Sequence, residues 1–296
     1  MSLFHGLSAF PITPTDEQGI VNTDEVMILA KHLSAHKVDS IGLLGSTGIY
    51  AYLVRTERKR AIRAAIQAVG GKTPLIVGIG SLRTDDAQNL ARDAAAEGAD
   101  GLLLAPVSYT PLTQEEAFQH YKAVAEVTDL PLCIYNNPST THFTFSQELL
   151  GRLADLATVQ AVKMPPRKEG DVAAELKQMR ESPVGQIAIG YSGDWIAAEA
   201  LLAGCDGWFS VLGGFLPKIA RALVDAAATE DIITVEQHQQ NLLPLWELFR
   251  EFGSLRVAYA AANHLKLSNA LPPRPILPLA ECDQNRVVAA LASLDQ

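Results

Sequence analysis

The feature that most limits the fold is a series of eight short apolar runs, spaced along the chain with helical segments between them. The runs are Leu7–Ile12, Ser40–Leu44, Pro74–Ile79, Gly101–Ala105, Pro131–Tyr135, Val159–Met164, Gln186–Gly190 and Gly207–Leu212. None of them alternates apolar with polar residues, which is typical of parallel strands covered on both faces. Strand–helix alternation repeated eight times predicts an α/β protein with a closed (β/α)8 barrel, the TIM-barrel architecture.

The segments between the runs carry helical signals. They are Thr23–Val38, Thr56–Val69, Thr84–Glu97, Ala117–Thr128, Ser146–Leu156, Asp171–Glu181 and Asp194–Ala203. Three more helical segments follow the last run, with the proline-rich link Asn269–Pro278 among them: Ile232–Phe252, Leu255–Leu267 and Asp283–Ser293. We therefore expect residues 1–225 to form the barrel and residues 226–296 to form a C-terminal helical extension of the same domain.

A doubly wound open sheet is the alternative architecture. Such a sheet usually carries a glycine-rich phosphate-binding fingerprint after its first strand. In this chain the first run leads into Thr13-Pro14-Thr15, which offers no phosphate cradle.

Composition narrows the function classes. Hydrophobic residues make up 48% and charged residues 19%, so the chain can bury a large core. The net charge of −9 disfavours nucleic acid and anionic membranes as partners. An anionic small substrate remains compatible, because the field inside a pocket can oppose the global charge.

Cysteine usage and the N-terminal sequence bear on location. The three cysteines show no CxxC spacing and are odd in number, which suggests neither a disulfide framework nor a zinc site. Residues 1–14 lack the basic and apolar regions of a signal peptide, and no apolar run reaches the roughly 18 residues that span a bilayer. We expect a cytoplasmic protein.

Lys163 is the residue with the clearest chemical potential. Of ten lysines it alone sits inside an apolar run, near the C-terminal end of the sixth strand, where barrel active sites lie. A lysine kept out of water is more often the free amine, the nucleophile that an imine requires. A solvent-facing lysine or a structural ion pair is the alternative, and spacing alone does not separate these interpretations.

Other strand ends add candidates. Tyr135 ends the fifth strand on the same face as Cys133, where its hydroxyl can relay protons, although a tyrosine bonded to backbone is the simpler interpretation. After the second strand, Gly45-Ser46-Thr47-Gly48 places two hydroxyls beside turn amides, which suits a carboxylate. An ordinary turn explains this tetrapeptide equally well.

Two further pocket candidates are Tyr109, after the fourth strand, and His142, after the fifth. A loop aromatic is the alternative for Tyr109, and a loop or core residue is the simpler interpretation of His142. No set of His, Asp and Glu at the strand ends indicates a metal site.

Taken together, these motifs resemble the dihydrodipicolinate synthase/N-acetylneuraminate lyase family of class I aldolases. The resemblance runs from Gly6 to about Pro278 and is carried by the order, spacing and strand-end placement of four motifs. They are Ala9-Phe10-Pro11-Ile12-Thr13-Pro14, Gly45-Ser46-Thr47-Gly48, Tyr135-Asn136-Asn137-Pro138 and Ala161-Val162-Lys163.

The resemblance implies a role for each matching residue. Lys163 matches the Schiff-base lysine, and Tyr135 matches the tyrosine that relays protons and orients the substrate. Ser46 and Thr47 match the pair that binds the carboxylate of a 2-oxo acid, with Ser46 also in the proton relay. The family needs no cofactor and commonly forms homotetramers built from dimers, so we expect a homo-oligomer acting on a small 2-oxo acid.

The sequence departs from the family pattern at three positions. Ile49 replaces a glutamate, and Thr140 replaces the arginine that helps true dihydrodipicolinate synthases bind a second carboxylate. Ser108 occupies the position of a tyrosine that a neighbouring subunit lends to the proton relay, and Tyr109 is one residue away. We expect Thr140, Thr141 and His142 to face the distal part of the pocket.

These observations support a Schiff-base lyase, either an aldolase or a dehydratase, acting on pyruvate or a sugar-derived 2-oxo acid. Dihydrodipicolinate synthase proper is the alternative within the enzyme class. A non-catalytic barrel that binds a 2-oxo acid is the alternative from another class, but binding alone does not require an imine-forming lysine.

Overall fold

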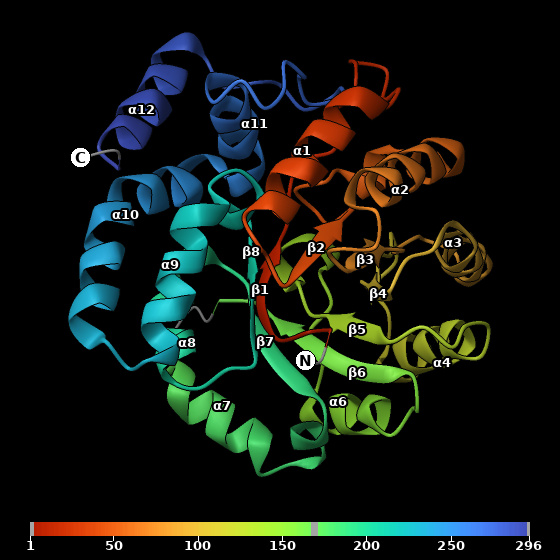
Figure 1. The fold of residues 1–296 in the computed structure, drawn as a ribbon. Helices are drawn as coiled ribbons and strands as arrows, with labels where there is room; N and C mark the ends of the chain where they lie inside the picture. The colour runs from red at the N-terminus through yellow and green to blue at the C-terminus, as the bar shows by residue number, and fades with distance from the viewer. Residues whose placement is uncertain (1–2, 167–170, 295–296) are drawn as a thin grey trace.

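The computed structural model describes residues 3–166 and 171–294, and its centre is a closed barrel of eight parallel strands. The strands are β1 Gly6–Ala9, β2 Ser40–Leu43, β3 Leu75–Gly78, β4 Gly101–Leu104, β5 Leu132–Tyr135, β6 Val159–Met164, β7 Ala188–Tyr191 and β8 Gly207–Ser210. Each strand pairs with its neighbours in sequence, and β8 pairs with β1 to close the ring. Figure 1 shows this ring with helices around it. The expected TIM barrel is confirmed.

Helices cover the outside of the ring and continue beyond it. The main ones are α1 Thr23–Ala35, α2 Arg55–Val69, α3 Thr84–Glu97, α4 Gln114–Ala125, α6 Gln147–Ala154, α7 Val172–Arg180, α8 Ala197–Leu202 and α9 Pro217–Ala228. A C-terminal segment adds α10 Ile232–Phe252, α11 Ser254–His264 and α12 Glu281–Ala292, which lie to one side of the barrel in Figure 1. Short helical turns join several elements: η1 Tyr50–Tyr52, α5 Pro138–Thr141, η2 Pro183–Gln186, η3 Asp194–Ile196 and η4 Leu212–Gly214.

The strands are mostly shorter than the apolar runs that predict them. Strand β1 ends at Ala9 although its apolar run continues to Ile12, and β8 ends at Ser210 because η4 begins at Leu212. Strand β7 begins two residues later than expected, since η2 takes up Gln186. Apolar residues beyond a strand end are still buried under neighbouring loops, so hydrophobicity alone does not mark where the ladder stops.

Two separate apolar clusters account for the unbroken apolar runs. One cluster joins alternate strand residues such as Ile134 and Val162 to the surrounding helices. The other holds the remaining strand residues and no helix residue, so it fills the barrel interior. Its members include Cys133, Tyr135 and Ala161, and the two-residue period places Lys163 in the same interior.

Aspartates fasten the floor of the barrel, at the N-terminal ends of the strands. Three aspartates lie immediately before even-numbered strands: Asp39 before β2, Asp100 before β4 and Asp206 before β8. The carboxylate of each accepts a hydrogen bond from a backbone N–H of the preceding odd-numbered strand. The donors are Leu7 of β1 at 2.7 Å, Leu75 of β3 at 2.8 Å and Ile189 of β7 at 2.6 Å. Each aspartate N–H also donates to the carbonyl of that same residue at 2.9 Å. The pair of strands β5 and β6 differs from these three. Thr158 stands before β6 in place of an aspartate, and Leu132 of β5 donates its N–H to the Thr158 backbone carbonyl.

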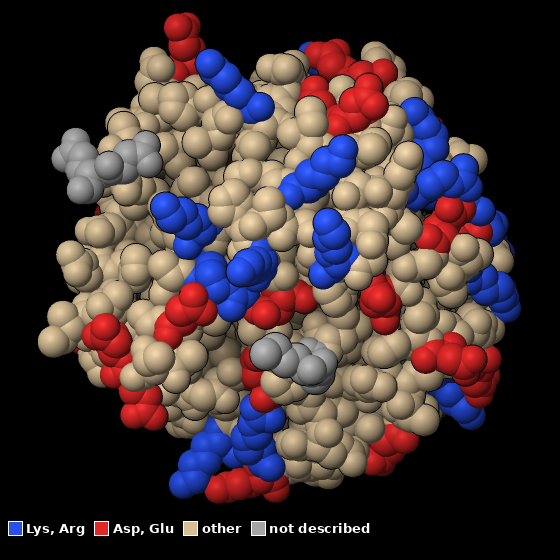
Figure 2. Space-filling model, in the orientation of Figure 1, with Lys and Arg blue, Asp and Glu red and all other residues tan. Residues whose placement is uncertain are grey.

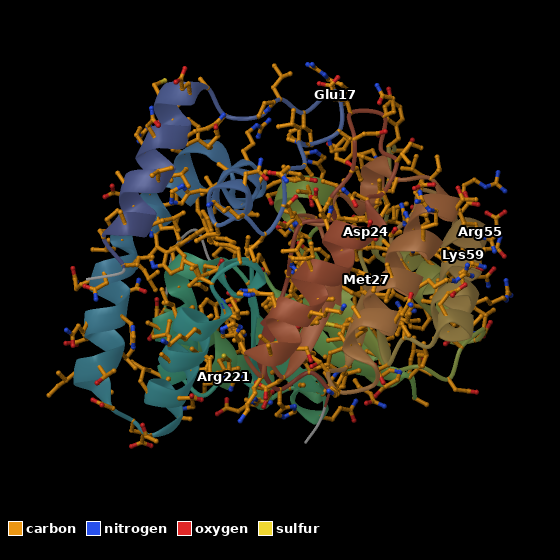
Figure 3. The ribbon with its side chains drawn as sticks, turned by 45° about the horizontal axis from the view of Figure 1, so that its top comes forward. Glu17, Asp24, Met27, Arg55, Lys59 and Arg221 are labelled. Atoms are coloured by element: carbon orange, nitrogen blue, oxygen red, sulfur yellow. The ribbon has the colours of Figure 1, made fainter. Side chains whose placement is uncertain are left out.

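Ion pairs tie the outer helices together. Asp93 of α3 accepts hydrogen bonds from Arg55 and Lys59 of α2 at 2.5 and 3.3 Å, and Figure 3 shows both cations on the side of α2 that faces α3. Arg221 of α9 pairs with Asp39, which follows α1, and it lies near α1 in the same view.

Charges of both signs are spread over the face on which the N-terminus lies, with neutral surface between them (Figure 2). Among the residues described, no helix is both long and apolar enough to cross a membrane.

Candidate active site

A cavity of about 490 Å³ opens where the C-terminal ends of the strands meet. Its walls come from the loops after β2, β5, β7 and β8, together with the junction of α10 and α11. Lys163, Tyr135, Ser46, Thr47 and Thr140 all line it. The fold therefore brings together most of the residues that the sequence singled out from separate strands.

The Lys163 amine lies at the base of this cavity, in an aromatic environment. Its Nζ atom lies 3.9 Å from the Phe10 ring centroid, 4.3 Å from that of Tyr135 and 5.6 Å from that of Phe209. The side chain is 4% exposed, and it makes no ion pair or hydrogen bond with any residue in the described part of the chain. An amine so enclosed and without a carboxylate partner is positioned to attack a carbonyl carbon that enters the cavity.

The position of Phe10 depends on a glycine in the neighbouring strand. A Cβ atom on Gly42 of β2 would lie between 2.2 and 2.4 Å from three carbons of the Phe10 ring. Only a residue without a side chain leaves room for the ring there. Gly42 thus allows Phe10 to form the surface on which Lys163 rests.

A chain of hydrogen bonds orients the Tyr135 hydroxyl. Ser139 donates to Asn137 Oδ1 at 2.7 Å, and Asn137 Nδ2 donates to the Tyr135 hydroxyl at 3.0 Å. The Ser46 hydroxyl lies 3.2 Å from the same phenol oxygen. Because the amide supplies one hydrogen bond, the phenol can direct its own proton toward Ser46 or toward a bound substrate.

The turn after β2 presents several donors to the cavity. The backbone N–H groups of Thr47 and Gly48 have no acceptor among the residues described, and the hydroxyls of Ser46 and Thr47 are beside them. Ile49 ends the turn with a φ of 54°, a left-handed conformation that is strained for a β-branched residue. A tight turn with free N–H groups suits an anion such as a carboxylate.

Asp194 stabilises the wall formed by the loops after β7 and β8. Its buried carboxylate accepts the Trp208 indole N–H at 2.8 Å and the N–H groups of Val211 and Leu212 at 3.0 and 2.8 Å. Burial raises the pKa of Asp194 to about 6, while these hydrogen bonds oppose the shift. The carboxylate therefore holds two loops together without an ion pair among the described residues.

Four residues named from the sequence, the buried Thr141 among them, do not line the cavity of this chain. Tyr109 is 96% exposed, and His142 is exposed with a φ of 54°. Gly48 contributes its N–H group to the turn, but it is not among the lining residues. Their proposed roles in substrate binding stay predictions.

Sequence reasoning did not assign roles to Asn137, Asp194 or Tyr50, all of which line the cavity. Asn137 lies within the quoted motif after β5, two residues from Tyr135, and that spacing was the available signal. Asp194 and Tyr50 had no comparable signal, because their burial depends on contacts made across the barrel.

Comparisons with known proteins agree with this geometry. The chain matches the Dihydrodipicolinate synthetase family over residues 3–294. A relative named 4-hydroxy-tetrahydrodipicolinate synthase, from Corynebacterium jeikeium, is 32% identical over 284 residues, which covers 94% of this chain and 90% of the relative. A solved dihydrodipicolinate synthase from Agrobacterium tumefaciens is 55% identical with a TM-score of 0.97, covering 99% and 98% of the two chains. The dihydrodipicolinate synthase of Acinetobacter baumannii, solved in complex with pyruvate, is 27% identical with a TM-score of 0.89 and 99% coverage of each chain.

Proposed function

The chain belongs to the dihydrodipicolinate synthetase family, and we propose that it is a Schiff-base lyase in which the Lys163 amine attacks C2 of a 2-oxo acid. One observation carries the proposal. Lys163 Nζ is enclosed by aromatic rings at the base of a cavity, and no described residue pairs with it. A lysine kept in such a place without a partner has no structural role that would account for the cost of burying it.

The chemistry follows from an amine meeting a ketone. Addition gives a carbinolamine, whose hydroxyl leaves as water after it takes a proton from Tyr135. The resulting protonated imine draws electrons from C3, so that the C3–C4 bond can break, a new bond can form at C3, or a C4 hydroxyl can leave. Tyr135 lies beside Lys163 and is hydrogen-bonded to Ser46, which supports its role in these proton transfers.

We assign the substrate carboxylate to the turn after β2. Ser46 and Thr47 line the same cavity as Lys163, and the N–H groups of Thr47 and Gly48 in this turn have no acceptor among the described residues. This arrangement binds an anion through hydrogen bonds alone, so the Lys163 amine is not needed as its ion-pair partner.

The distal wall of the cavity favours a neutral substrate tail. Among the lining residues within the described ranges 3–166 and 171–294, Lys163 is the only lysine, arginine or histidine. The distal wall offers the hydroxyls of Ser139, Thr140 and Ser192 and the aromatic face of Trp195. We therefore favour pyruvate or a sugar-derived 2-oxo acid with hydroxyl groups over a substrate with a second carboxylate.

Dihydrodipicolinate synthase proper is the second candidate, because the relatives described above carry that name. A coupled assay with pyruvate and aspartate semialdehyde separates the two. Turnover comparable with that on pyruvate-releasing sugar acids would favour the synthase, and Thr140 would then have to be compatible with binding the second carboxylate.

We further propose that the protein is a cytoplasmic homo-oligomer. Val54, Leu82 and Tyr109 are exposed apolar side chains on the loops after β2, β3 and β4, which are neighbours in the barrel. A second copy of the chain would cover them. We also propose that residues 226–296 extend the same domain, since α10 to α12 share one apolar cluster with the barrel helices.

The test of the main proposal is chemical trapping. Pyruvate and borohydride should give a stable adduct on Lys163, which peptide mass spectrometry locates, and Lys163→Ala should give none. Lys122→Ala, which alters an exposed lysine, is the matched control and should be trapped like the wild type. No adduct with pyruvate or with longer 2-oxo acids would sink the proposal and favour a non-catalytic binding barrel.

A further inference from the structure

Tyr50 is a buried tyrosine of the cavity wall that has no role in the Schiff-base steps assigned to Lys163, Tyr135 and Ser46. It lines the same cavity as Lys163 and is 7% exposed. Its hydroxyl makes no hydrogen bond to any residue in the described ranges, 3–166 and 171–294. A buried phenol whose oxygen faces an open cavity is available to a substrate, to water or to another proton carrier.

The backbone places Tyr50 close to the relay. Tyr50 begins η1, at the end of the turn that carries Ser46, and its N–H donates to the Gly45 carbonyl at 3.5 Å. Tyr50 and Tyr135 are close enough for the charge of one to raise the pKa of the other. The two phenols therefore share one electrostatic environment in the cavity that Ser46 also lines.

The Tyr50 ring is held in place by a glycine. A Cβ atom on Gly80, after β3, would lie 2.9 Å from one ring carbon of Tyr50 and 3.3 Å from its hydroxyl oxygen. The hydroxyl-bearing edge of the ring therefore lies against backbone where a side chain would collide with it. This contact fixes the hydroxyl at the ends of the strands.

A buried cation accompanies the ring. The Arg58 guanidinium lies 5.4 Å from the Tyr50 ring centroid and donates to the carbonyls of Gly80 and Leu53 at 3.0 and 3.2 Å. Arg58 is 7% exposed and forms no ion pair with any described carboxylate, although Asp86 acts on it at longer range. Burial lowers the pKa of Arg58 to about 10. Burial and the neighbouring Tyr135 hold the pKa of Tyr50 above its usual value, and Arg58 offsets part of this rise.

A buried arginine without a carboxylate is costly unless a negative charge forms beside it. We infer that Tyr50 supplies this negative charge. It is a second phenol that exchanges protons with Tyr135, and its phenolate forms transiently beside Arg58. This inference rests on the proposed Schiff-base function. Tyr50 acts through Tyr135 and is a positioning and relay residue, not a group that touches the reacting atoms.

The proton balance closes within the site. When the carbinolamine C2–O bond breaks, the hydroxyl leaves as water with the Tyr135 proton, and the nitrogen lone pair forms the C=N bond. Tyr50 returns a proton to Tyr135 across a water molecule of the cavity, which leaves the negative charge on Tyr50 beside Arg58. Before C3 loses its proton to form the enamine, Tyr135 passes its proton back to Tyr50 across the same water, and the resulting Tyr135 phenolate accepts the C3 proton.

The exchange of pyruvate methyl protons for deuterium tests this path, because it requires the enamine and no second substrate. Proton NMR of pyruvate in D2O gives the exchange rate, and borohydride trapping gives the amount of imine at equilibrium. Tyr50→Phe keeps the ring against Gly80 and removes only the hydroxyl. We expect it to be trapped on Lys163 like the wild type, to exchange at least tenfold more slowly, and to reach half-saturation within twofold of the wild-type pyruvate concentration.

Arg58 provides the second variant. Arg58→Met should slow exchange as Tyr50→Phe does, and Arg58→Lys should restore part of the rate because it keeps the charge. In both slow variants the rate should rise more steeply with pH than in the wild type, since hydroxide then replaces the relay. A merely structural role would lower the rate by the same factor at every pH.

Tyr52→Phe removes the same atom from the next tyrosine of η1, which is 46% exposed, and should keep the wild-type pH profile.

The outcomes separate this inference from the proposed function. A wild-type protein that gives neither adduct nor exchange overturns the Schiff-base proposal and the relay with it. A wild type that is trapped, together with a folded Tyr50→Phe variant that exchanges at the wild-type rate, overturns the relay alone. The same holds if Arg58→Met exchanges as fast as the wild type while both proteins show the same thermal melting.

Discussion

Tyr135 and Lys163 lie opposite each other in neighbouring strands β5 and β6, with Lys163 Nζ 4.3 Å from the centre of the Tyr135 ring. Their strands are parallel and in register at this pair, so both side chains enter the barrel interior at the same level. The ladder therefore fixes the distance between the proposed nucleophile and the proposed proton carrier. A loop residue would not be held with the same accuracy.

Tyr135→Phe should slow imine formation more than the binding of pyruvate. The variant keeps the ring beside Lys163 but removes the hydroxyl that Ser46 and Asn137 contact. General acid–base groups typically contribute about 10²–10⁴-fold, so we expect a loss of rate in that range. Rapid-quench borohydride trapping measures the rate. A variant that forms the adduct at the wild-type rate would show that another group carries the proton.

Asn137→Ala should reduce the same rate by a smaller factor, about tenfold, because it removes one hydrogen bond to the phenol oxygen. Ser139→Ala is the graded companion, since Ser139 reaches the phenol only through the Asn137 amide. Its effect should be below that of Asn137→Ala. Equal effects in both variants would mean that the loop after β5 had moved as a whole, and a melting curve of each variant checks this.

Gly42→Ala should damage both stability and chemistry. The added methyl group collides with the Phe10 ring, and overpacking of this kind typically costs about 1–3 kcal/mol. Displacement of Phe10 should also disturb Lys163 and lower the trapping rate. The control is Gly151→Ala in α6, where the new methyl group meets Pro183 at 3.4 Å and helix propensity improves. Urea unfolding and trapping of both variants give the comparison.

Asp194 should make stability fall as pH rises through the weakly acidic range. Its folded-state pKa of about 6 lies above the usual value for an unfolded chain, so the folded protein binds this proton more tightly. The associated stability is fully present below about pH 4 and is lost as pH rises through about 6, with a slope of at most about 1.4 kcal/mol per pH unit. Urea unfolding between these values should show a component that Asp194→Asn lacks. Identical pH slopes in the two proteins would contradict this account.

Asp100→Ala should weaken the barrel without changing the chemistry. The substitution removes the acceptor of the Leu75 N–H group, which should lower the free energy of unfolding by about 1 kcal/mol. The floor lies at the opposite end of the strands from Lys163, so the rate of adduct formation should stay at the wild-type value. Asp129→Ala, at an exposed position, is the control for loss of a surface charge. A change in trapping rate with Asp100→Ala would indicate that the floor and the site are coupled.

Much of this architecture is readable from local sequence patterns. Each buried strand gives an unbroken apolar run, and Lys163 interrupts one such run at a strand end, which predicts its place in the barrel interior. Asn137 lies close enough to Tyr135 in sequence for a shared role to be expected. These features depend on spacing along one strand or on neighbouring residues.

Other features depend on contacts between distant segments, and the sequence does not reveal them. Tyr50 is buried because Gly80 and Arg58 receive its ring, and neither residue carries that information alone. Tyr109 shows the opposite case: its position in sequence suggests a pocket residue, but its loop turns the side chain into solvent. Solvent exposure and pocket membership are decided by loop paths, which local patterns do not determine.

The aspartates of the floor group the strands of the barrel in pairs, although the hydrogen-bonded ring of strands is continuous. Each carboxylate fastens an odd-numbered strand to the even-numbered strand that follows it, and no described floor aspartate fastens an even-numbered strand to the next odd-numbered one in this way. The repeating unit at this end of the barrel is therefore a pair of strands. Three of the four pairs, all but β5–β6, carry this fastening within themselves. Gene segments that encode two strand–helix units of this kind are therefore the natural pieces for circular permutation, duplication or exchange between barrels.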